Sequence, residues 1–76
     1  MEPLEAFAAN VNRLRAERGL TQERLAELAD LHMTDIARIE TLRRDPGVKV
    51  VAKIARGLGV KTSELFEGVE EPQRNV

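Results

Sequence analysis

The stretch GLTQERLAELADLHMTDIARIE, residues 19–40, decides the fold of this chain. Its apolar residues recur at helical spacing in two short blocks, which predicts helices at about 22–29 and 33–40 joined by a tight turn at Asp30. The apolar residues are Leu25, Ala26 and Ala29 in the first block and Ile36 and Ile39 in the second. Two such helices bury their stripes against each other, so we expect the opposite face of the second helix to meet solvent.

That outward face carries five residues of mixed polarity: His32, Met33, Thr34, Asp35 and Arg38. A short exposed helix braced by a second helix fits the major groove of B-DNA, so the pattern predicts a helix-turn-helix that reads base edges. Asp35 is open to three interpretations. Its carboxylate could accept a hydrogen bond from a cytosine amino group, discourage non-specific phosphate binding, or favour the positive end of the helix dipole.

The remaining segments also have helical spacing, and we expect an all-α fold of five helices. A first helix is predicted at about 4–18, a fourth from Pro46 to about Gly57, and a short fifth from Thr62. Asp45 is expected to cap the fourth helix and Pro46 to open it. The predicted core stripe of this helix is Val48, Val51, Ile54, Ala55 and Leu58.

Local signals place the ends of the second helix. Thr21 is a suitable N-cap, and Asp30 tolerates the left-handed backbone that the tight turn is expected to need. We expect residues 1–68 to form one helix-turn-helix domain. Residues 69–76 are rich in Glu, Pro, Gln and Asn, and are predicted to be an acidic, flexible tail.

Composition narrows the possible classes of protein. The 76 residues include no Cys, and the single His lacks partners, so neither a disulfide nor a metal site is expected. No apolar run reaches about 18 residues and no signal-peptide pattern opens the chain, so we expect a cytoplasmic protein without a membrane span. Motifs of phosphate loops and metalloproteases are missing from the sequence, so we expect no enzymatic activity, cofactor or small-molecule ligand.

The net charge of −1 is unevenly distributed along the sequence. Residues 31–61 hold seven Lys or Arg against three acids, a net charge of +4, whereas residues 1–30 carry −2 and residues 62–76 carry −3. Positive charge therefore coincides with the predicted reading helix and the segment after it, where contacts to DNA phosphates are needed. On charge alone, a solvated helix surface explains the run equally well.

Several segments, in this order and at this spacing, resemble the lambda-repressor-like helix-turn-helix domains of the Xre type. They are LRAERGLTQERLAELA (14–29), DIARIE (35–40), RRDP (43–46), VVAKIARGLGV (50–60) and SELF (63–66). The resemblance covers about residues 4–68 and implies a compact five-helix domain that binds DNA. In size, the chain resembles the small controller proteins of restriction-modification systems, small phage-type repressors and the antitoxins of toxin–antitoxin pairs.

The resemblance also implies roles for residues at matching positions. Met33, Thr34 and Arg38 fall where family members touch base edges, and the fork of Arg38 can bond guanine O6 and N7 together. Contacts to the DNA backbone are implied for Gln22 at the start of the second helix and for Arg43 and Arg44 in the loop after the third.

Arg15 and Glu40 occupy the positions where this family often pairs its first helix with the end of its third, so the resemblance implies a structural ion pair there. Three residues depart from the family pattern. Asp30 and Leu42 stand where Gly is usual, and His32 stands where a small capping residue is usual. We expect His32 to cap the helix or contact a phosphate. Leu42 is expected to extend the third helix or to cover an apolar patch, which leaves the aim of the following arginines open.

A single short helix reads only about four or five base pairs, so we expect a homodimer on a palindromic operator. The dimer interface must use this domain, and the candidates are Leu65, Phe66, Val69 and, more weakly, Val50. A position in the monomer core is an equal alternative for Leu65 and Phe66. The expected partner is double-stranded DNA. The alternative function is an antitoxin or an interaction module that binds a partner protein, for which Gln22 and the basic side chains are dispensable.

Overall fold

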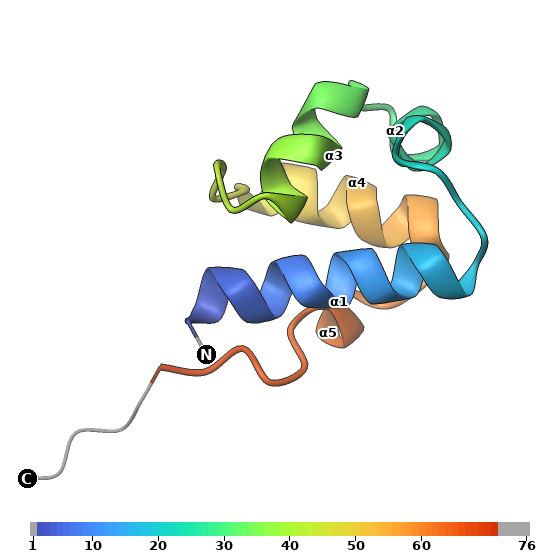
Figure 1. Cartoon of the computed structure of the whole chain (residues 1–76). Helices are drawn as coiled ribbons and strands as arrows, with labels where there is room; N and C mark the ends of the chain where they lie inside the picture. Colours follow the sequence, from blue (N-terminus) through green and yellow to red (C-terminus); the bar gives the residue numbers. More distant parts are fainter. Residues whose placement is uncertain (1, 72–76) are drawn as a thin grey trace, which may run out of the picture.

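Five α-helices form the protein in the computed structural model, which describes residues 2–71 (Figure 1). They are α1 (Pro3–Glu17), α2 (Gln22–Ala29), α3 (Met33–Glu40), α4 (Val48–Leu58) and α5 (Thr62–Leu65). The part of the chain that the structure describes contains no strand. The prediction of an all-α, five-helix fold is therefore confirmed, and α2 and α3 begin and end at the predicted residues.

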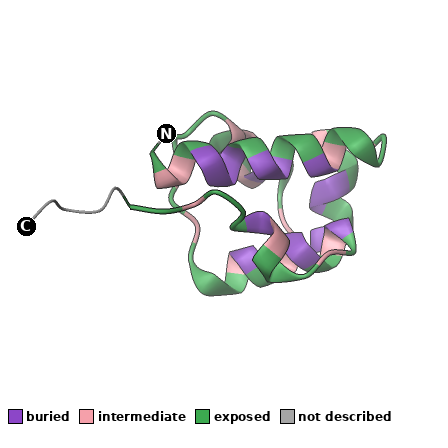
Figure 2. Cartoon of the chain, turned by 90° about the horizontal axis from the view of Figure 1, so that it is seen from below, coloured by how far each residue is buried: buried purple, intermediate pink, exposed green. Residues whose placement is uncertain are grey.

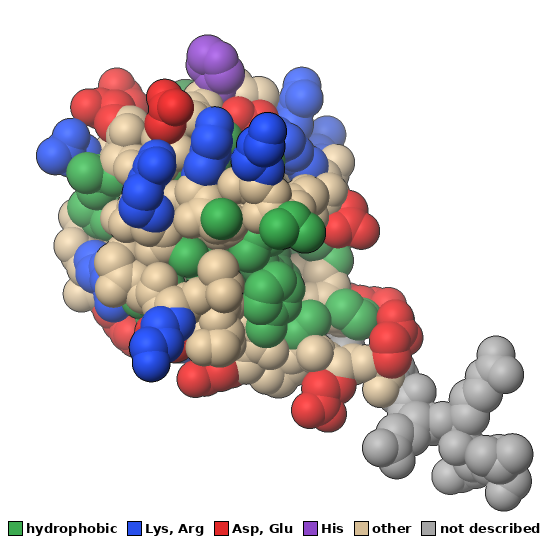
Figure 3. Space-filling view, turned by 180° about the vertical axis from the view of Figure 1, so that it is seen from behind, with side chains coloured by type: hydrophobic (Ala, Val, Ile, Leu, Met, Phe, Trp, Pro, Cys, Tyr) green, Lys and Arg blue, Asp and Glu red, His purple; other side chains and the backbone are tan. Residues whose placement is uncertain are grey.

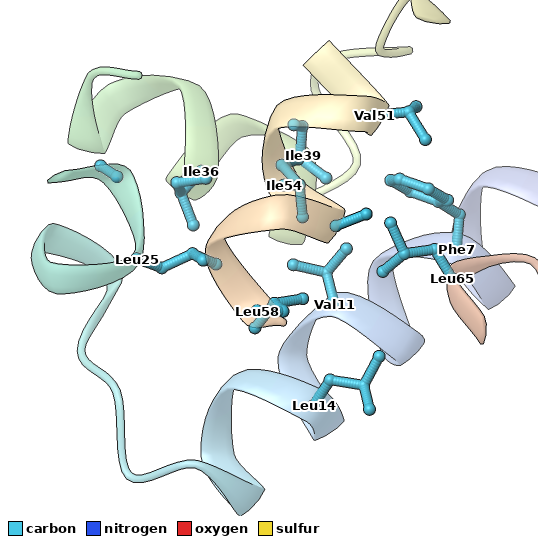
Figure 4. Packing of buried hydrophobic residues seen from close by; sticks show 12 residues of the cluster. Phe7, Val11, Leu14, Leu25, Ile36, Ile39, Val51, Ile54, Leu58 and Leu65 are labelled. Atoms are coloured by element: carbon cyan, nitrogen blue, oxygen red, sulfur yellow. The ribbon is translucent and has the colours of Figure 1, made fainter. Parts of the chain in front are cut away.

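The hydrophobic core joins all five helices. Helices α1 and α4 lie on either side of it, α2 and α3 cover one end, and α5 packs against both α1 and α4. Figure 4 shows their apolar side chains converging, and Figure 2 shows the buried residues on the inward sides of the helices. The largest completely buried side chains are Val11, Leu25, Ile36, Ile39, Ile54 and Leu65. This core fixes α3 against the rest of the domain.

Local hydrogen bonds and backbone geometry fix both ends of α2 and the turn that leads to α3. The Thr21 hydroxyl accepts a hydrogen bond from the Arg24 backbone N–H at 3.0 Å, which caps the first turn of α2. Asp30 ends α2 with φ 55° and ψ 50°, the left-handed conformation expected for it. The Leu31 N–H then donates to the Ala26 carbonyl at 2.9 Å. The backbone of Asp30 and the hydrogen bond of Leu31 set the direction in which the chain enters α3.

The start of α4 differs from the prediction. Gly47 is the N-cap in place of Asp45, and Pro46 precedes the helix instead of opening it. Residues 43–47 form no regular secondary structure. Pro46 disfavours helical backbone at Asp45, and Gly47 is still extended, with φ −78° and ψ 171°. Val48 therefore occupies the first helical position, beyond the edge of the core, and is 87% exposed. Its predicted place in the core stripe is wrong, whereas the other four residues of the stripe are buried.

Helices α2 and α4 approach each other most closely at Gly57. A Cβ atom on this glycine would lie 3.1 Å from the Cβ and backbone nitrogen of Ala29. Because that distance is shorter than an ordinary contact, the missing side chain allows the two backbones to meet, and α4 supports the helix-turn-helix from behind.

The described residues show three further features. Within residues 2–71, no helix has both the length and the apolar character needed to cross a membrane. In the same residues, no three His, Cys, Asp or Glu side chains gather where they could share a metal ion. Val69 packs against the core, one residue beyond the predicted domain limit of 68. Of the predicted tail, residues 72–76 lie outside the described residues.

Candidate nucleic-acid interface

Helix α3 has one buried and one exposed face. Ile36 and Ile39 are completely buried in the core. The side chains of the outward face that the sequence assigned to base contact, Met33, Thr34 and Arg38, are all exposed. Met33 is 51% exposed although it is apolar, so about half of its surface remains open to a ligand. An exposed apolar side chain beside a hydroxyl and a guanidinium offers the mixed chemistry that base edges require.

Asp35 organises the N-terminal end of α3. Its Oδ2 accepts a hydrogen bond from the backbone N–H of His32, the N-cap residue, at 3.1 Å. Its Oδ1 accepts a hydrogen bond from Nη1 of Arg44, which reaches back from the loop after α3. Of the three interpretations of Asp35, these contacts favour a structural role in the first turn, because both carboxylate oxygens already have partners.

Glu40 connects the C-terminal end of α3 to two other helices. Its carboxylate accepts hydrogen bonds from Arg15 Nε at 2.8 Å and Arg15 Nη2 at 3.0 Å. The side-chain amides of Asn12 and Gln22 each donate to the same carboxylate at 3.1 Å. Arg15 also donates from Nη1 to the Leu20 carbonyl at 2.7 Å. The Glu40 side chain is only 6% exposed and that of Arg15 17% exposed, so this is a nearly buried network that joins α1, α2 and α3.

The network changes the proton affinity of both partners. Burial alone raises the pKa of Glu40, but the hydrogen bonds from Arg15, Asn12 and Gln22 outweigh it, and the pKa lies below its ordinary value of 4.5. The hydrogen bond to Glu40 raises the pKa of Arg15, although burial acts in the opposite direction. Both groups are therefore charged at neutral pH, and the pair holds the end of α3 with its full charge.

Leu42 ends α3 instead of extending it. Its φ of 64° is the left-handed conformation in which glycine is usual, and its N–H donates to the Ile39 carbonyl at 3.1 Å. The Arg43 N–H follows with a 2.7 Å hydrogen bond to the Arg38 carbonyl. The first of the two expectations for Leu42 is therefore wrong. Its side chain is 45% exposed and borders a shallow depression beside Ala8 and Ala9.

The residues assigned to the DNA backbone occupy different environments. Arg43 is exposed, and no carboxylate among residues 2–71 forms an ion pair with it. His32 is exposed at the N-cap of α3. Arg44 is partly buried against Asp35, and one amide hydrogen of Gln22 is used by Glu40. The second amide hydrogen of Gln22 remains available at the start of α2, where backbone N–H groups also point outward.

Sequence reasoning missed two asparagines that hold the helices together. Asn12 donates to Glu40, and its position three residues before Arg15 on the same helix face was the available signal. Asn10 is buried, and its amide donates at 2.8 Å to the carbonyls of both Leu65 and Glu67. It thereby fixes the end of α5. A polar residue within an apolar stripe suggested no partner 55 positions away.

An apolar groove of about 340 Å³ lies away from α3, between α1, the start of α4 and α5. Its lining includes Phe66, Val69 and the exposed Val48. Figure 3 shows hydrophobic side chains gathered on one face below a row of Lys and Arg side chains. Among the candidate interface residues, Phe66 is 44% exposed and Val69 and Val50 are partly buried. Leu65 is completely buried in the monomer, so its assignment to an interface is wrong and the core alternative holds.

The fold and the exposed face of α3 together define the class of helix-turn-helix transcriptional regulators. Residues 11–65 match the family model described as Helix-turn-helix, which is more than half of the chain. The chain therefore belongs to the Helix-turn-helix family.

Individual relatives agree with this assignment. The control protein C.MunI of Mycoplasma sp is 36% identical over 66 residues, which are 86% of this chain and 89% of that protein. The restriction-modification controller protein C.AhdI of Aeromonas hydrophila has a similar structure, with a TM-score of 0.80 at 32% identity over 83% of this chain and 96% of that one. The controller protein C.Esp1396I, bound to a 19-base-pair DNA duplex, gives a TM-score of 0.81 at 32% identity over 91% and 92% of the two chains.

Proposed function

We propose that this protein is a non-catalytic, cytoplasmic transcriptional regulator that binds double-stranded DNA with α3 in the major groove. The observation that carries the proposal is the exposed face of α3, on which Met33, Thr34 and Arg38 have no role in the core while Ile36 and Ile39 hold the helix from behind. Membership in the Helix-turn-helix family and the similarity to a controller protein bound to a DNA duplex support it.

Two groups of residues divide the work of binding. Arg38, Thr34 and Met33 read base edges, with Arg38 bonding a guanine and Met33 making apolar contact only. Gln22, His32, Arg43 and Arg44 contact the phosphate backbone and set the position of the protein on the duplex. The positive end of the α2 dipole adds to the contact at Gln22.

The proposed assembly is a homodimer on a palindromic operator. The apolar groove between α1, α4 and α5 supplies its interface, because Phe66 and Val48 expose apolar area there. The two α3 helices of the dimer then enter the major groove at two positions one helical turn, roughly 34 Å, apart. Sedimentation of the free protein and of its DNA complex tests this assembly. A strictly monomeric species in both measurements contradicts it.

Selection from a random duplex library is the first test, with binding repeated over a range of salt concentrations. Recovery of a palindrome and a steep decrease of affinity with salt are expected for a dimer that neutralises several phosphates. Failure to enrich any sequence, with no binding at low salt, contradicts the proposed function.

Two substitutions test the division between reading and positioning residues. Arg38→Ala is expected to relax the base preference at one operator position, with a loss of about 1–3 kcal/mol of discrimination. Arg43→Ala is expected to weaken binding to all sequences about equally and to reduce the salt slope by about one unit. The operator and a set of single-base variants, each titrated with both proteins, separate the two effects. Identical behaviour of the two variants contradicts the division.

A further inference from the structure

We propose that Asp35 is a specificity-determining residue because it holds the guanidinium of Arg44 against α3. The inference rests on the proposed DNA-binding function and concerns how the protein separates its operator from other DNA. Arg43 and Arg44 are neighbours in the basic loop, yet only Arg44 is paired with a carboxylate among residues 2–71. One loop arginine is thus exposed and unpaired within residues 2–71, and the other is held on α3.

The contacts of Asp35 give the held arginine a defined place. One carboxylate oxygen is used by the His32 N–H at the N-cap of α3, and the other accepts from a single nitrogen of Arg44. A guanidinium has five N–H donors, so the pair directs the remaining donors of Arg44 without consuming them. Side-chain exposures of 34% for Arg44 and 21% for Asp35 leave the pair within reach of a ligand at the surface.

This arrangement affects specific and non-specific complexes differently. Non-specific binding depends on cations that can reach phosphates in many registers. Arg44 cannot do so while it is held, and the charge of Asp35 offsets its attraction for distant phosphates. When α3 is seated in the operator, however, Arg44 is carried to the duplex in a fixed position, and no side-chain freedom has to be lost at that moment. Asp35 therefore favours the operator complex and disfavours the others.

The variant Asp35→Asn tests this role. Asparagine keeps an oxygen for the His32 N–H and removes the charge that holds Arg44. We expect a duplex of random sequence to bind up to about fivefold more tightly, with a salt slope steeper by about one unit. The operator recovered from the library is expected to bind up to about fivefold more weakly. These opposite changes are measured by fluorescence anisotropy with both duplexes at several salt concentrations.

Three further variants identify the cause. In Asp35→Asn/Arg44→Ala, the gain on the random duplex is expected to disappear, because the released cation is gone. In the otherwise native chain, Arg44→Ala is expected to reduce the salt slope on the random duplex by less than Arg43→Ala does. Glu23→Gln removes an exposed acid from the first turn of α2 and is the matched charge control. Glu23→Gln is expected to change the affinity for both duplexes in the same direction.

The opposite signs distinguish the proposal from simpler roles. If Asp35→Asn increases the affinity for both duplexes alike, as is expected for Glu23→Gln, Asp35 acts only through its charge and the proposal is overturned. If Asp35→Asn decreases the affinity for both duplexes alike, Asp35 is only a structural cap and the proposal is also overturned. A native chain that binds neither duplex overturns the proposed function itself, so the two failures are distinguishable.

Discussion

The two ends of α3 are held by carboxylates in contrasting environments. At the C-terminal end, Glu40 is 6% exposed and accepts four hydrogen bonds from α1 and α2. At the N-terminal end, Asp35 is 21% exposed and accepts one hydrogen bond from the N-cap and one from the loop arginine. Both pairs would count equally in a tally of ion pairs, but burial and the number of partners give them different energies and different tasks.

The contrast shows how a small domain separates rigidity from adjustment. The buried end fixes the direction of α3 relative to α1, and any change there disturbs the whole fold. The less buried end has fewer hydrogen bonds, so we expect its ion pair to contribute less to stability than the buried pair does. Substitutions near that end are therefore expected to change recognition with little loss of stability.

The largest expected effect comes from breaking the buried pair. Glu40→Ala leaves the Arg15 guanidinium without its charged partner at 17% exposure, and we expect the free energy of unfolding to fall by about 3 kcal/mol. Urea denaturation of both proteins measures the difference. Glu17→Ala is the matched control, because Glu17 forms an exposed pair with Arg13 at 3.1 Å. Its expected cost is within about 0.5 kcal/mol. Equal costs for the two variants contradict the contrast.

The pH dependence of stability sharpens the same point. The pKa of Glu40 is depressed in the folded protein, so its contribution is fully present above its ordinary value of 4.5 and is lost as pH falls through the lower folded value. We expect native protein to lose stability more steeply below about pH 4.5 than Glu40→Gln, which has no proton to gain at this site. Denaturation series between pH 6 and pH 3 give the difference between the two slopes. Parallel slopes contradict the prediction.

A substitution at the N-terminal end of α3 is expected to lower the free energy of unfolding far less. Asp35→Asn removes the charge that holds Arg44 and keeps an oxygen for the N-cap, so we expect stability to change by less than about 1 kcal/mol. The same denaturation assay applies, with Glu40→Gln measured beside it as the comparison. A loss from Asp35→Asn as large as that from Glu40→Gln removes the distinction between a rigid end and an adjustable end.

Sequence patterns predicted the parts of this structure that depend on neighbours along the chain. The ends of α2 followed from Thr21 and Asp30, whose side chains determine a cap and a left-handed turn locally. The buried face of α3 followed from the spacing of Ile36 and Ile39. These predictions needed no knowledge of where the other helices lie.

Features that depend on the path of a loop were not predicted. The Asp35–Arg44 pair joins residues nine positions apart, and Leu42, with φ 64°, lies in the turn between them. Leucine itself gives no signal for a left-handed backbone. The family pattern has glycine at this position, but it did not show whether the chain keeps the same turn with leucine there. Val48 was misplaced for a related reason, because the loop continues past the predicted cap at Asp45 to the observed N-cap at Gly47.

The smallest expected effect on stability comes from Leu42, which lies in the loop between the C-terminal end of α3 and Arg44. A leucine at φ 64° carries a steric cost of about 1–2 kcal/mol that glycine does not. Leu42→Gly removes this cost but enlarges the freedom of the unfolded chain, which offsets about 0.4–1 kcal/mol of the gain. Because the side chain is 45% exposed, little packing is lost, and we expect a net gain of about 0.5 kcal/mol in the free energy of unfolding. Leu42→Ala is the matched control: it removes the same side chain beyond Cβ and retains the backbone cost, so it is expected to be less stable than Leu42→Gly. If the alanine variant proves the more stable of the two, the loop does not depend on the left-handed residue, and the path that brings Arg44 to Asp35 must be set elsewhere.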